Sequence, residues 1–470
     1  MAKIVHAYSL PFIHQAWLPE TLARQLAQRG QGCPRLPAEP AVNGQVHWQF
    51  EHHGPLPWME YLYDFRFADL DGDGEIEWLL TCGAHYQAAH CQDGGLLWEY
   101  RDESAGFMDL RYDSSFPTLD LDRDGVPELV CPRKRDGALQ LCLVDARTGQ
   151  VRRSVPYPDP GAAGQGRRSS IQAIHLTGTK YPQALVVGWD ERSLAAYDSR
   201  LNLLWQVSAL GDNTPSGRTP FGRTPFAWDI DGDGRDELLW GGQLLDHDGA
   251  RLWRAGELPG LAAGSVAPAV RLLPLDDGDP YVQPPYLLFS SAATCFDLTG
   301  RLQWQHTELL HGQALHTGKL RGDLPGRQVV VYDAASWSNP AAPDRVLALD
   351  RHGQTLWEVP VSPPAIQEGG SGLWLGDWDG DGLDEALVND DGQTRVYDGH
   401  GRLVDSFPGH LVYAFDLLGD RRVEAVVLSG DGPGMELRIV SNDARNPHPA
   451  TNNFVPFRRT STAMYNCTRY

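Results

Sequence analysis

The stretch LGDWDGDGLDEALV at residues 375–388 decides the fold, because it recurs in register elsewhere in the chain. The other copies are FADLDGDGEIEWLL (67–80), TLDLDRDGVPELV (118–130) and AWDIDGDGRDELLW (227–240). Each copy has apolar residues before an acidic loop and an apolar run after it, a pattern typical of two strands joined by a tight turn. Repetition of such a unit indicates a repeat architecture.

A second phrase, which ends in an aromatic strand, follows each acidic turn. Examples are DGGLLWEY (93–100), RLNLLWQV (200–207) and HGQTLWEV (352–359). Degenerate copies of the acidic phrase lie at 171–188, 266–289, 314–332 and 412–428, which gives eight first phrases but only seven closing phrases after them. The eighth closing phrase is NGQVHWQF (43–50), near the other end of the chain. In a ring, a strand from the start of the chain can complete the last repeat, which accounts for the position of the eighth closing phrase.

We therefore predict an all-β fold, an eight-bladed β-propeller with four strands in each blade. Strand 43–50 is expected to complete the last blade, and a seven-bladed ring is the alternative if the 266–306 unit is misread. The predicted parts are an N-terminal arm (1–42) with one helix at 19–30, the propeller (43–442), and a C-terminal tail (443–470) that packs on it.

Composition narrows the class of protein. The 470 residues carry a formal net charge of -21, and 41% of them are hydrophobic, enough to bury a core. An acidic surface argues against nucleic acid or an anionic membrane as partner. No apolar run reaches the roughly 18 residues of a membrane span. The start, MAKIVHAYSLPFIHQAW, shows no export signal, so we expect a cytoplasmic monomer, with a secreted or periplasmic location as the alternative.

The acidic turns share the spacing D-x-D-x-D-G-x-x-E. Hard oxygen ligands that converge in this way suit Ca²⁺, so we expect up to four structural calcium ions; solvated acidic turns are the alternative. The predicted ligands are Asp69, Asp71, Asp73, Glu77, Asp120, Asp122, Asp124, Glu128, Asp229, Asp231, Asp233, Glu237, Asp377, Asp379, Asp381 and Glu385.

The loops on the opposite face of a propeller surround its central opening, where ligands bind. In this acidic chain these loops collect arginine, histidine and aromatic residues, which suits an anionic sugar. The predicted substrate-binding residues are Tyr63, Arg168, Arg223, Trp337 and His410. Ordinary solvated loop residues are the alternative.

Two segments carry a resemblance to a known family. WDIDGDGRDELLWGGQLLDHDGARLW (228–253) and HGQALHTGKLRGDLPGRQVVVY (311–332) resemble blades of rhamnogalacturonan lyases of polysaccharide lyase family eleven. The tail DLLGDRRVEAVVL (416–428) with ELRIV (436–440) is similar to that family's last blade. The resemblance implies an eight-bladed propeller with calcium, and a lyase that acts on an acidic polysaccharide or oligosaccharide with rhamnose–uronic acid linkages.

Lyases that act on ulvan or on rhamnosyl-glucuronate are similar in outline and use a His, Tyr and Arg set on the upper loops. The resemblance thus implies β-elimination, with His85 as base, Tyr112 as acid, and Arg133 or Arg135 binding the carboxylate. Lys134 is the alternative base, and His311 is a further catalytic candidate. A zinc site at His85 with nearby cysteines is another interpretation.

Two other functions remain open. A non-catalytic, calcium-stabilised propeller could bind acidic glycans or a protein partner. A hydrolase with paired carboxylates ranks last, because the upper loops contain few acids.

Overall fold

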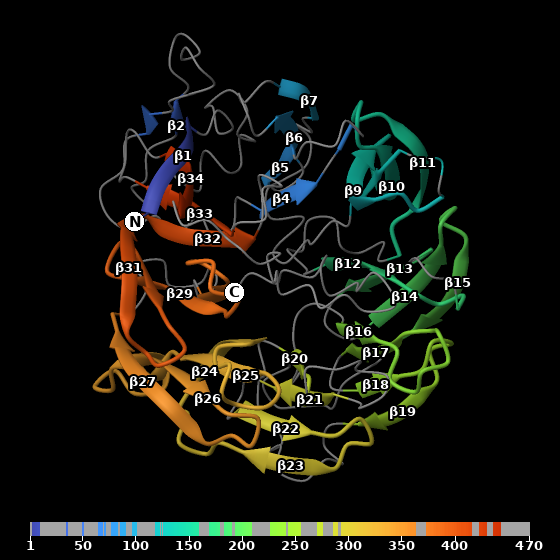
Figure 1. Ribbon diagram of the computed structural model, residues 1–470. Coiled ribbons are helices and arrows are strands. Elements are labelled where there is room, and N and C mark those ends of the chain that lie inside the picture. Colours follow the sequence, from blue (N-terminus) through green and yellow to red (C-terminus); the bar gives the residue numbers. More distant parts are fainter. Residues whose placement is uncertain are drawn as a thin grey trace.

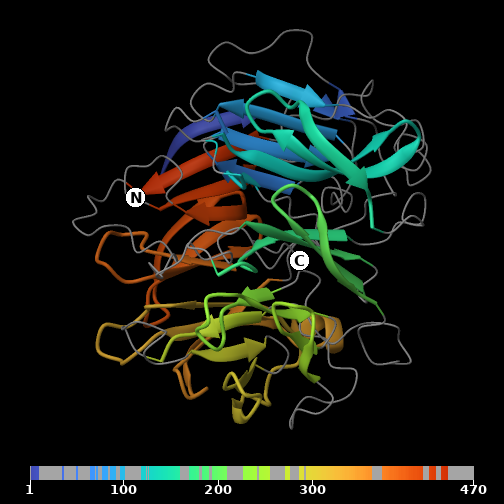
Figure 2. The same ribbon diagram turned by 90° about the vertical axis from the view of Figure 1, so that its right-hand side faces the viewer.

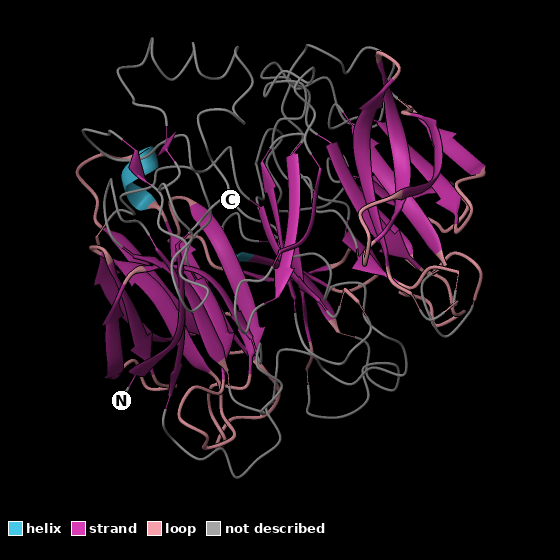
Figure 3. Ribbon diagram, turned by 90° about the horizontal axis from the view of Figure 1, so that it is seen from above, coloured by secondary structure: helices cyan, strands magenta, loops and turns pink. Residues whose placement is uncertain are grey.

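Strands make up nearly all of the structure that a computed structural model describes for this chain (Figure 3). The described residues are 2–9, 34–35, 49–50, 64–68, 70–71, 77–82, 85–90, 96–100, 118–122, 124, 126–158, 169–178, 183–189, 193–208, 226–240, 243–254, 270–275, 285–289, 293–362, 373–415, 423–429 and 436–442. Within these ranges the one α-helix is α3 (Ala335–Ser338), and no helix is long and apolar enough to cross a membrane. The predicted helix at 19–30 and the tail at 443–470 lie outside the described residues.

The described strands form eight four-stranded antiparallel sheets, numbered here in chain order. Sheet 1 is β4 (Asp64–Ala68), β5 (Glu77–Cys82), β6 (His85–His90) and β7 (Leu96–Tyr100). Sheet 2 is β8 (Thr118–Leu119), β9 (Glu128–Arg135), β10 (Ala138–Asp145) and β11 (Val151–Pro156). Sheet 3 is β12 (Ser169–Ile174), β13 (Ala184–Trp189), β14 (Ser193–Asp198) and β15 (Leu203–Val207). Sheet 4 is β16 (Phe226–Trp228), β17 (Glu237–Trp240), β18 (Gln243–Leu245) and β19 (Arg251–Arg254).

The second half of the chain continues in the same order. Sheet 5 is β20 (Val270–Leu273), β21 (Tyr286–Phe289), β22 (Thr294–Phe296) and β23 (Leu302–Gln305). Sheet 6 is β24 (Gly312–Gly318), β25 (Gln328–Asp333), β26 (Asp344–Leu349) and β27 (Thr355–Val361). Sheet 7 is β28 (Leu373–Gly376), β29 (Glu385–Asp390), β30 (Gln393–Tyr397) and β31 (Leu403–Pro408). Sheet 8 is β32 (His410–Phe415), β33 (Glu424–Ser429) and β34 (Glu436–Asn442), joined by β1 (Ala2–Ser9).

The sheets follow one another around a common centre, with the first strand of each sheet nearest to it (Figure 1). The first strands β20, β24, β28 and β32 contact one another in that order, while β11, β15 and β23 lie on the outside. In the view turned by 90° about the vertical axis, neighbouring sheets lie next to one another from the top of the picture to the bottom (Figure 2). The all-β, propeller-like arrangement predicted from the repeats is confirmed.

Burial explains why the second strand of a sheet has an apolar centre. The second strands β25 and β29 are buried at every residue, because a neighbouring sheet covers each of their faces. Their centres are accordingly apolar, VVVY in β25 and ALV in β29, whereas the outer strand β11 has only half-buried and exposed residues.

A tryptophan on the outer strand joins each of several sheets to the next. The indole Nε1 of Trp98 donates to Ala146 O at 2.6 Å, and that of Trp304 donates to Arg351 O at 2.9 Å. Trp205 makes the same bond with His247 O at 2.9 Å. Each acceptor lies in the turn between the third and fourth strands of the following sheet. This indole–turn contact therefore fixes neighbouring sheets against each other.

The prediction that strand 43–50 completes the last blade is wrong. The fourth strand of sheet 8 is β1, which pairs with β34 from Ala2↔Asn442 to Ser9↔Glu436. The end of the predicted strand, β3 (Gln49–Phe50), pairs with β2 (Pro34–Arg35) in a separate two-stranded sheet. NGQVHWQF shares the tryptophan of the closing phrases, but its described residues, Gln49 and Phe50, pair with β2 and not with β34.

Gly353→Ala should destabilise the protein more than Gly137→Ala. Both glycines have a φ of +79°, so alanine incurs a similar left-handed backbone cost of roughly 1–2 kcal/mol at either position. At Gly353 a Cβ would lie 2.5 Å from the Trp304 ring, whereas nothing lies within 4 Å at Gly137. We expect an additional loss of about 1–3 kcal/mol at Gly353, measured as the free energy of unfolding in denaturant. Equal losses would contradict the indole–turn contact.

Candidate functional site

The acidic loop between β28 and β29 folds around its own backbone amides. Asp377 accepts the N–H of Gly380 at 2.7 Å and that of Gly382 at 3.1 Å. Glu385, the first residue of β29, accepts the N–H of Trp378 at 2.7 Å. The two carboxylates are only 1% and 2% exposed, so these bonds hold them inside the loop. We name the acidic loops by their sheets, and this one (377–385) is the seventh loop.

The fourth loop (229–237) repeats this geometry. Asp229 accepts the N–H of Gly232 at 2.9 Å and that of Gly234 at 3.2 Å. Glu237 accepts the N–H of Ile230 at 2.6 Å. The glutamates of sheets 1 and 2 make the equivalent bond, Glu77 with Leu70 and Glu128 with Leu121. The local sequence thus determines the loop conformation wherever it recurs.

Carboxylate oxygens converge in three of the four predicted calcium sets. Within each set, one oxygen from each residue lies within 4.8 Å of the others: Asp120, Asp122 and Glu128; Asp229, Asp231 and Glu237; Asp377, Asp379 and Glu385. The remaining predicted ligands, Asp124, Asp233 and Asp381, each accept the N–H of the residue two positions later. In the first set Asp71 and Glu77 are described, whereas Asp69 and Asp73 lie outside the described residues.

Burial raises the pKa of the loop glutamates. The pKa of Glu237 rises to about 8 and that of Glu385 to about 9, first because they are desolvated and then because aspartates surround them. Glu237 Oε1 is buried and has no hydrogen-bond partner among the described residues. A cation would neutralise this charge and bind this oxygen, so the all-oxygen sets fit a hard divalent ion such as Ca²⁺.

Two residues near the fourth loop were missed by the sequence analysis. Asp246 and His247, in the turn between β18 and β19, place ligand atoms within 4.8 Å of each other and of a Glu237 oxygen. The recurrent aspartate that begins this turn could have indicated them. It occurs as Asp145, Asp198, Asp246, Asp297, Asp350 and Asp398.

The eighth residue of the fourth and seventh loops ties each loop to the preceding sheet. Asp236 Oδ2 accepts the N–H of His175 at 2.7 Å, and the Asp236 N–H donates to His175 O at 2.6 Å. Asp384 makes the same pair of bonds with Lys319, at 2.7 and 2.8 Å. An ion held in these loops would therefore stiffen a junction between two sheets.

On the opposite face, His311 lies directly before β24. Its backbone N–H donates to Asp333 Oδ1 at 2.7 Å, and its Nε2 lies 2.9 Å from Gln313 Oε1. Arg345 Nε also donates to Asp333, at 3.1 Å. The half-buried imidazole is thus held at the end of the sheet where the sequence analysis expected it.

Arg133 is buried where sheets 1 and 2 meet. It is 2% exposed, its guanidinium carbon lies 4.0 Å from the Tyr100 ring centroid, and Nη1 donates to Gly149 O at 2.9 Å. We therefore do not retain the prediction that it binds a carboxylate. Lys134 is half-buried and Arg135 is exposed, so Arg135 remains available for this role.

The other predicted site residues are described only in part. His410 is half-buried, with Nε2 3.1 Å from Asn389 Nδ2. The backbone of His85 pairs with Cys82 at the turn between β5 and β6. Tyr63, Tyr112, Arg168 and Arg223 lie outside the described residues, as does the side chain of Trp337 in α3.

One cluster near the centre was missed by the sequence analysis. Arg271, His316 and Trp374 lie on the first strands of sheets 5, 6 and 7, and we call them the inner cluster. The ring centroids of His316 and Trp374 are 5.4 Å apart. Burial, and then the charge of Arg271, lower the pKa of His316 well below its ordinary value. The cluster joins a guanidinium, a neutral imidazole and an indole. His316 ends the phrase HGQALH, and this histidine is the sequence signal that could have indicated the cluster.

Comparisons with known proteins agree with this architecture. A curated relative, rhamnogalacturonan exolyase YesX of Bacillus subtilis, is 25% identical over 251 residues, which are 43% of this chain and 41% of the relative. The chain thus spans about two fifths of the length of that relative. No family model matches the chain.

Solved structures match over more of the chain. The crystal structure of exotype rhamnogalacturonan lyase YesX has a TM-score of 0.58 at 20% identity and covers 85% of this chain and 74% of that one. A Bacillus licheniformis rhamnogalacturonan lyase gives 0.57 at 20% identity, covering 86% and 74%. The V. cholerae biofilm matrix protein Bap1 gives 0.53 at 14% identity, covering 92% and 93%. The chain therefore has a rhamnogalacturonan lyase-like fold.

The chelated protein should lose stability as the pH rises, and calcium should remove most of that loss. The folded pKa values of Glu237 and Glu385, about 8 and about 9, exceed the ordinary value of 4.5. The protonated forms of Glu237 and Glu385 therefore contribute fully to the free energy of unfolding below pH 4.5. This contribution is lost as the pH rises through the folded pKa values. The measurement is the melting temperature between about pH 6 and about pH 9, in EDTA or in calcium.

A matched pair of variants checks this assignment. Asp379→Asn should reduce the gain in melting temperature from calcium, because Asp379 belongs to the seventh set. Asp136→Asn should leave the gain unchanged, because Asp136 is exposed in the turn between β9 and β10, and asparagine tolerates its φ of 51°. An equal gain in both variants would argue against the seventh loop as a metal site.

Proposed function

We propose that this chain is a polysaccharide lyase that cleaves rhamnose–uronic acid linkages of the rhamnogalacturonan type by β-elimination. The observation that carries the proposal is the shared fold with two rhamnogalacturonan lyases over more than four fifths of the chain. The sequence match to a rhamnogalacturonan exolyase supports the same substrate class. We expect the partner to be an acidic polysaccharide or oligosaccharide.

The proposed scaffold is an eight-bladed propeller closed by the N-terminal strand. Eight four-stranded sheets among the described residues favour eight blades over seven. The pairing of β1 with β34 supports closure by two distant parts of the chain. Such a ring would present the loops at one end of the strands around a single opening.

We further propose that the acidic loops bind structural Ca²⁺. Support comes from the convergent carboxylate sets of the fourth and seventh loops and from the buried Glu237 Oε1, which has no partner among the described residues. Asp236 and Asp384 bond each loop backbone to a neighbouring sheet. In this proposal the ions stabilise the contacts between sheets and take no part in the reaction.

β-Elimination at a uronic acid requires three tasks. A base removes the proton on C5, the released electron pair forms the C4–C5 double bond, and the C4–O4 bond breaks while an acid protonates O4. A cation must neutralise the carboxylate, which makes the C5 proton more acidic. On the proposed face His85 or Lys134 would act as base, Tyr112 as acid and Arg135 as the cation, and His311 is a further catalytic candidate.

The inner cluster would extend this site toward the centre. Arg271 supplies a fixed positive charge, the Trp374 ring offers a face for a sugar, and His316 is neutral at ordinary pH because its pKa is lowered. We propose that these groups contact the uronate. We therefore expect Tyr63, Arg168, Arg223, Trp337 and His410 to contact the outer sugars.

The purified protein should release an unsaturated product from rhamnogalacturonan, detected by the ultraviolet absorbance of the new double bond. We expect His85→Ala and Tyr112→Phe each to lower kcat by about 10²–10⁴-fold, the range for general acid or base catalysis. His400→Gln is the control, because His400 is exposed in the turn between β30 and β31, at the acidic-loop end of the sheet. Binding of the polysaccharide without any product would instead favour a non-catalytic glycan-binding propeller.

Arg135 and Arg133 should respond differently to the same substitution. Arg135→Gln should lower kcat/KM by about 10- to 100-fold through loss of a charged hydrogen bond, with little change in melting temperature, because the side chain is exposed. Arg133→Gln should mainly lower stability, by about 2 kcal/mol, because it removes a buried guanidinium stacked on Tyr100. If Arg133→Gln instead lowered kcat/KM and Arg135→Gln lowered mainly stability, Arg133 would be the residue that binds the carboxylate.

A further inference from the structure

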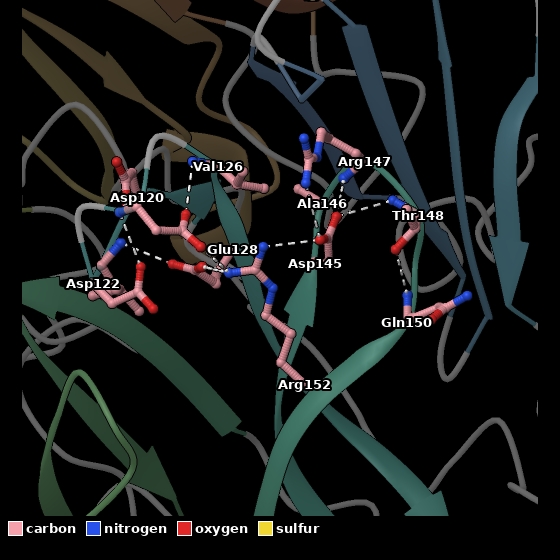
Figure 4. A network of polar contacts seen from close by, with 12 residues as sticks. Asp120, Asp122, Val126, Glu128, Asp145, Ala146, Arg147, Thr148, Gln150 and Arg152 are labelled. Atoms are coloured by element: carbon pink, nitrogen blue, oxygen red, sulfur yellow. Dashed lines mark hydrogen bonds and ion pairs between the residues drawn. The ribbon is translucent and has the colours of Figure 1, made fainter.

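Arg152, the second residue of β11, directs its guanidinium into the second loop (120–128), as Figure 4 shows. Nη1 donates to Glu128 Oε1 at 2.6 Å and lies 2.9 Å from Asp124 Oδ2. Nη2 donates to Asp145 Oδ2 at 2.9 Å. The Glu128 side chain is fully buried and that of Arg152 is 26% exposed. One side chain therefore bridges three carboxylates at the place where the other loops gather ligands.

The same glutamate oxygen differs between the second and fourth loops. In both loops Oε2 of the last glutamate accepts a backbone N–H, from Leu121 or from Ile230. Oε1 of Glu128 is bonded to Arg152, whereas Oε1 of Glu237 is buried and has no partner among the described residues. The guanidinium in the second loop thus takes the oxygen that a metal ion would take in the fourth.

The equivalent residues in sheets 4 and 7 carry no charge. Arg152 lies three residues after Gly149, a turn glycine with positive φ. The corresponding residues after Gly249 and Gly401 are Leu252 and Val404, which are 51% and 44% exposed. Burial raises the pKa of all three glutamates; the charge of Arg152 opposes that rise at Glu128, whose pKa is about 7, whereas neighbouring aspartates add to it at Glu237 and Glu385. The resident positive charge therefore distinguishes the second loop from these two.

Sheet 6 shows the same solution in a degenerate loop. There Lys319 and Arg321 occupy the places of the first two aspartates of the acidic phrase. Lys319 Nζ donates to Leu324 O at 2.9 Å and to Gly326 O at 3.1 Å, and Arg321 Nε donates to Asp323 at 2.7 Å. A side-chain cation can thus stabilise such a turn in this protein.

We propose that Arg152 is the resident cation of the second loop and excludes calcium from it, although this loop keeps all four acids of the repeat. Calcium could enter only by displacing the guanidinium, because two cations about 4 Å apart repel each other. Displacement would break its bonds to all three carboxylates. The inference rests on the calcium proposal for the fourth and seventh loops, and it reduces the four ions expected from the sequence by one.

The test is the number of calcium ions bound per chain, measured by isothermal titration calorimetry with calcium alone. Arg152→Leu, which copies the residue at position 252, should bind one ion more than the wild type. Arg153→Leu is the matched control, because Arg153 bonds to Asn202 of sheet 3 instead of the loop. In EDTA, Arg152→Leu should melt at a lower temperature than the wild type. Addition of calcium should raise the melting temperature of Arg152→Leu more than that of the wild type.

A second variant locates the additional ion. Asp122→Asn should leave the wild-type count unchanged, and should remove the additional ion in the Arg152→Leu background. The proposal is overturned if Asp122→Asn removes an ion from the wild type, or if Arg152→Leu gains none. A wild type that binds no calcium would contradict the calcium proposal, whereas an ion gained by Arg152→Leu would still support the role of Arg152.

Discussion

The indole–turn contact between consecutive sheets is the interaction on which the rest of this structure depends. A four-stranded sheet with two apolar faces is not stable alone, so each sheet needs a neighbour in a fixed position. Trp98 and Trp304 provide that position by packing an indole against a turn and donating to its backbone. In sheet 2 the equivalent residue is Arg153, which bonds to Asn202 of the next sheet. The turns held in this way also carry the aspartates that lie closest to the acidic loops.

The acidic loops also lie at these junctions between sheets. The glutamate that ends each of these loops is buried, so its charge must be neutralised. On our proposals the protein neutralises it in two ways, by calcium in the fourth and seventh loops and by Arg152 in the second. The degenerate sixth loop carries Lys319 and Arg321 in place of two of the acids. One repeated backbone thus accommodates metal and side-chain cations.

The sequence predicted what is local and repeated. The grouping of strands into four-stranded sheets and the convergence of Asp377, Asp379 and Glu385 both follow from residues close together in the chain. The closing strand could not be predicted in this way, because the pairing of β1 with β34 joins opposite ends of the chain. The burial of Arg133 and the inner cluster escaped prediction for a related reason. Both arise where separate sheets meet, and the sequence alone does not show which side chains face across that gap.

The pairing of β1 with β34 has a consequence for biosynthesis. The strand that completes sheet 8, β1, is made long before β34, the strand with which it pairs. Until then β1 has exposed backbone groups and no native neighbour, and such an edge can pair with other chains. Closing so long a segment also costs chain entropy that is recovered only when the last sheet forms. Sheet 8 can therefore close only after β34 has been made.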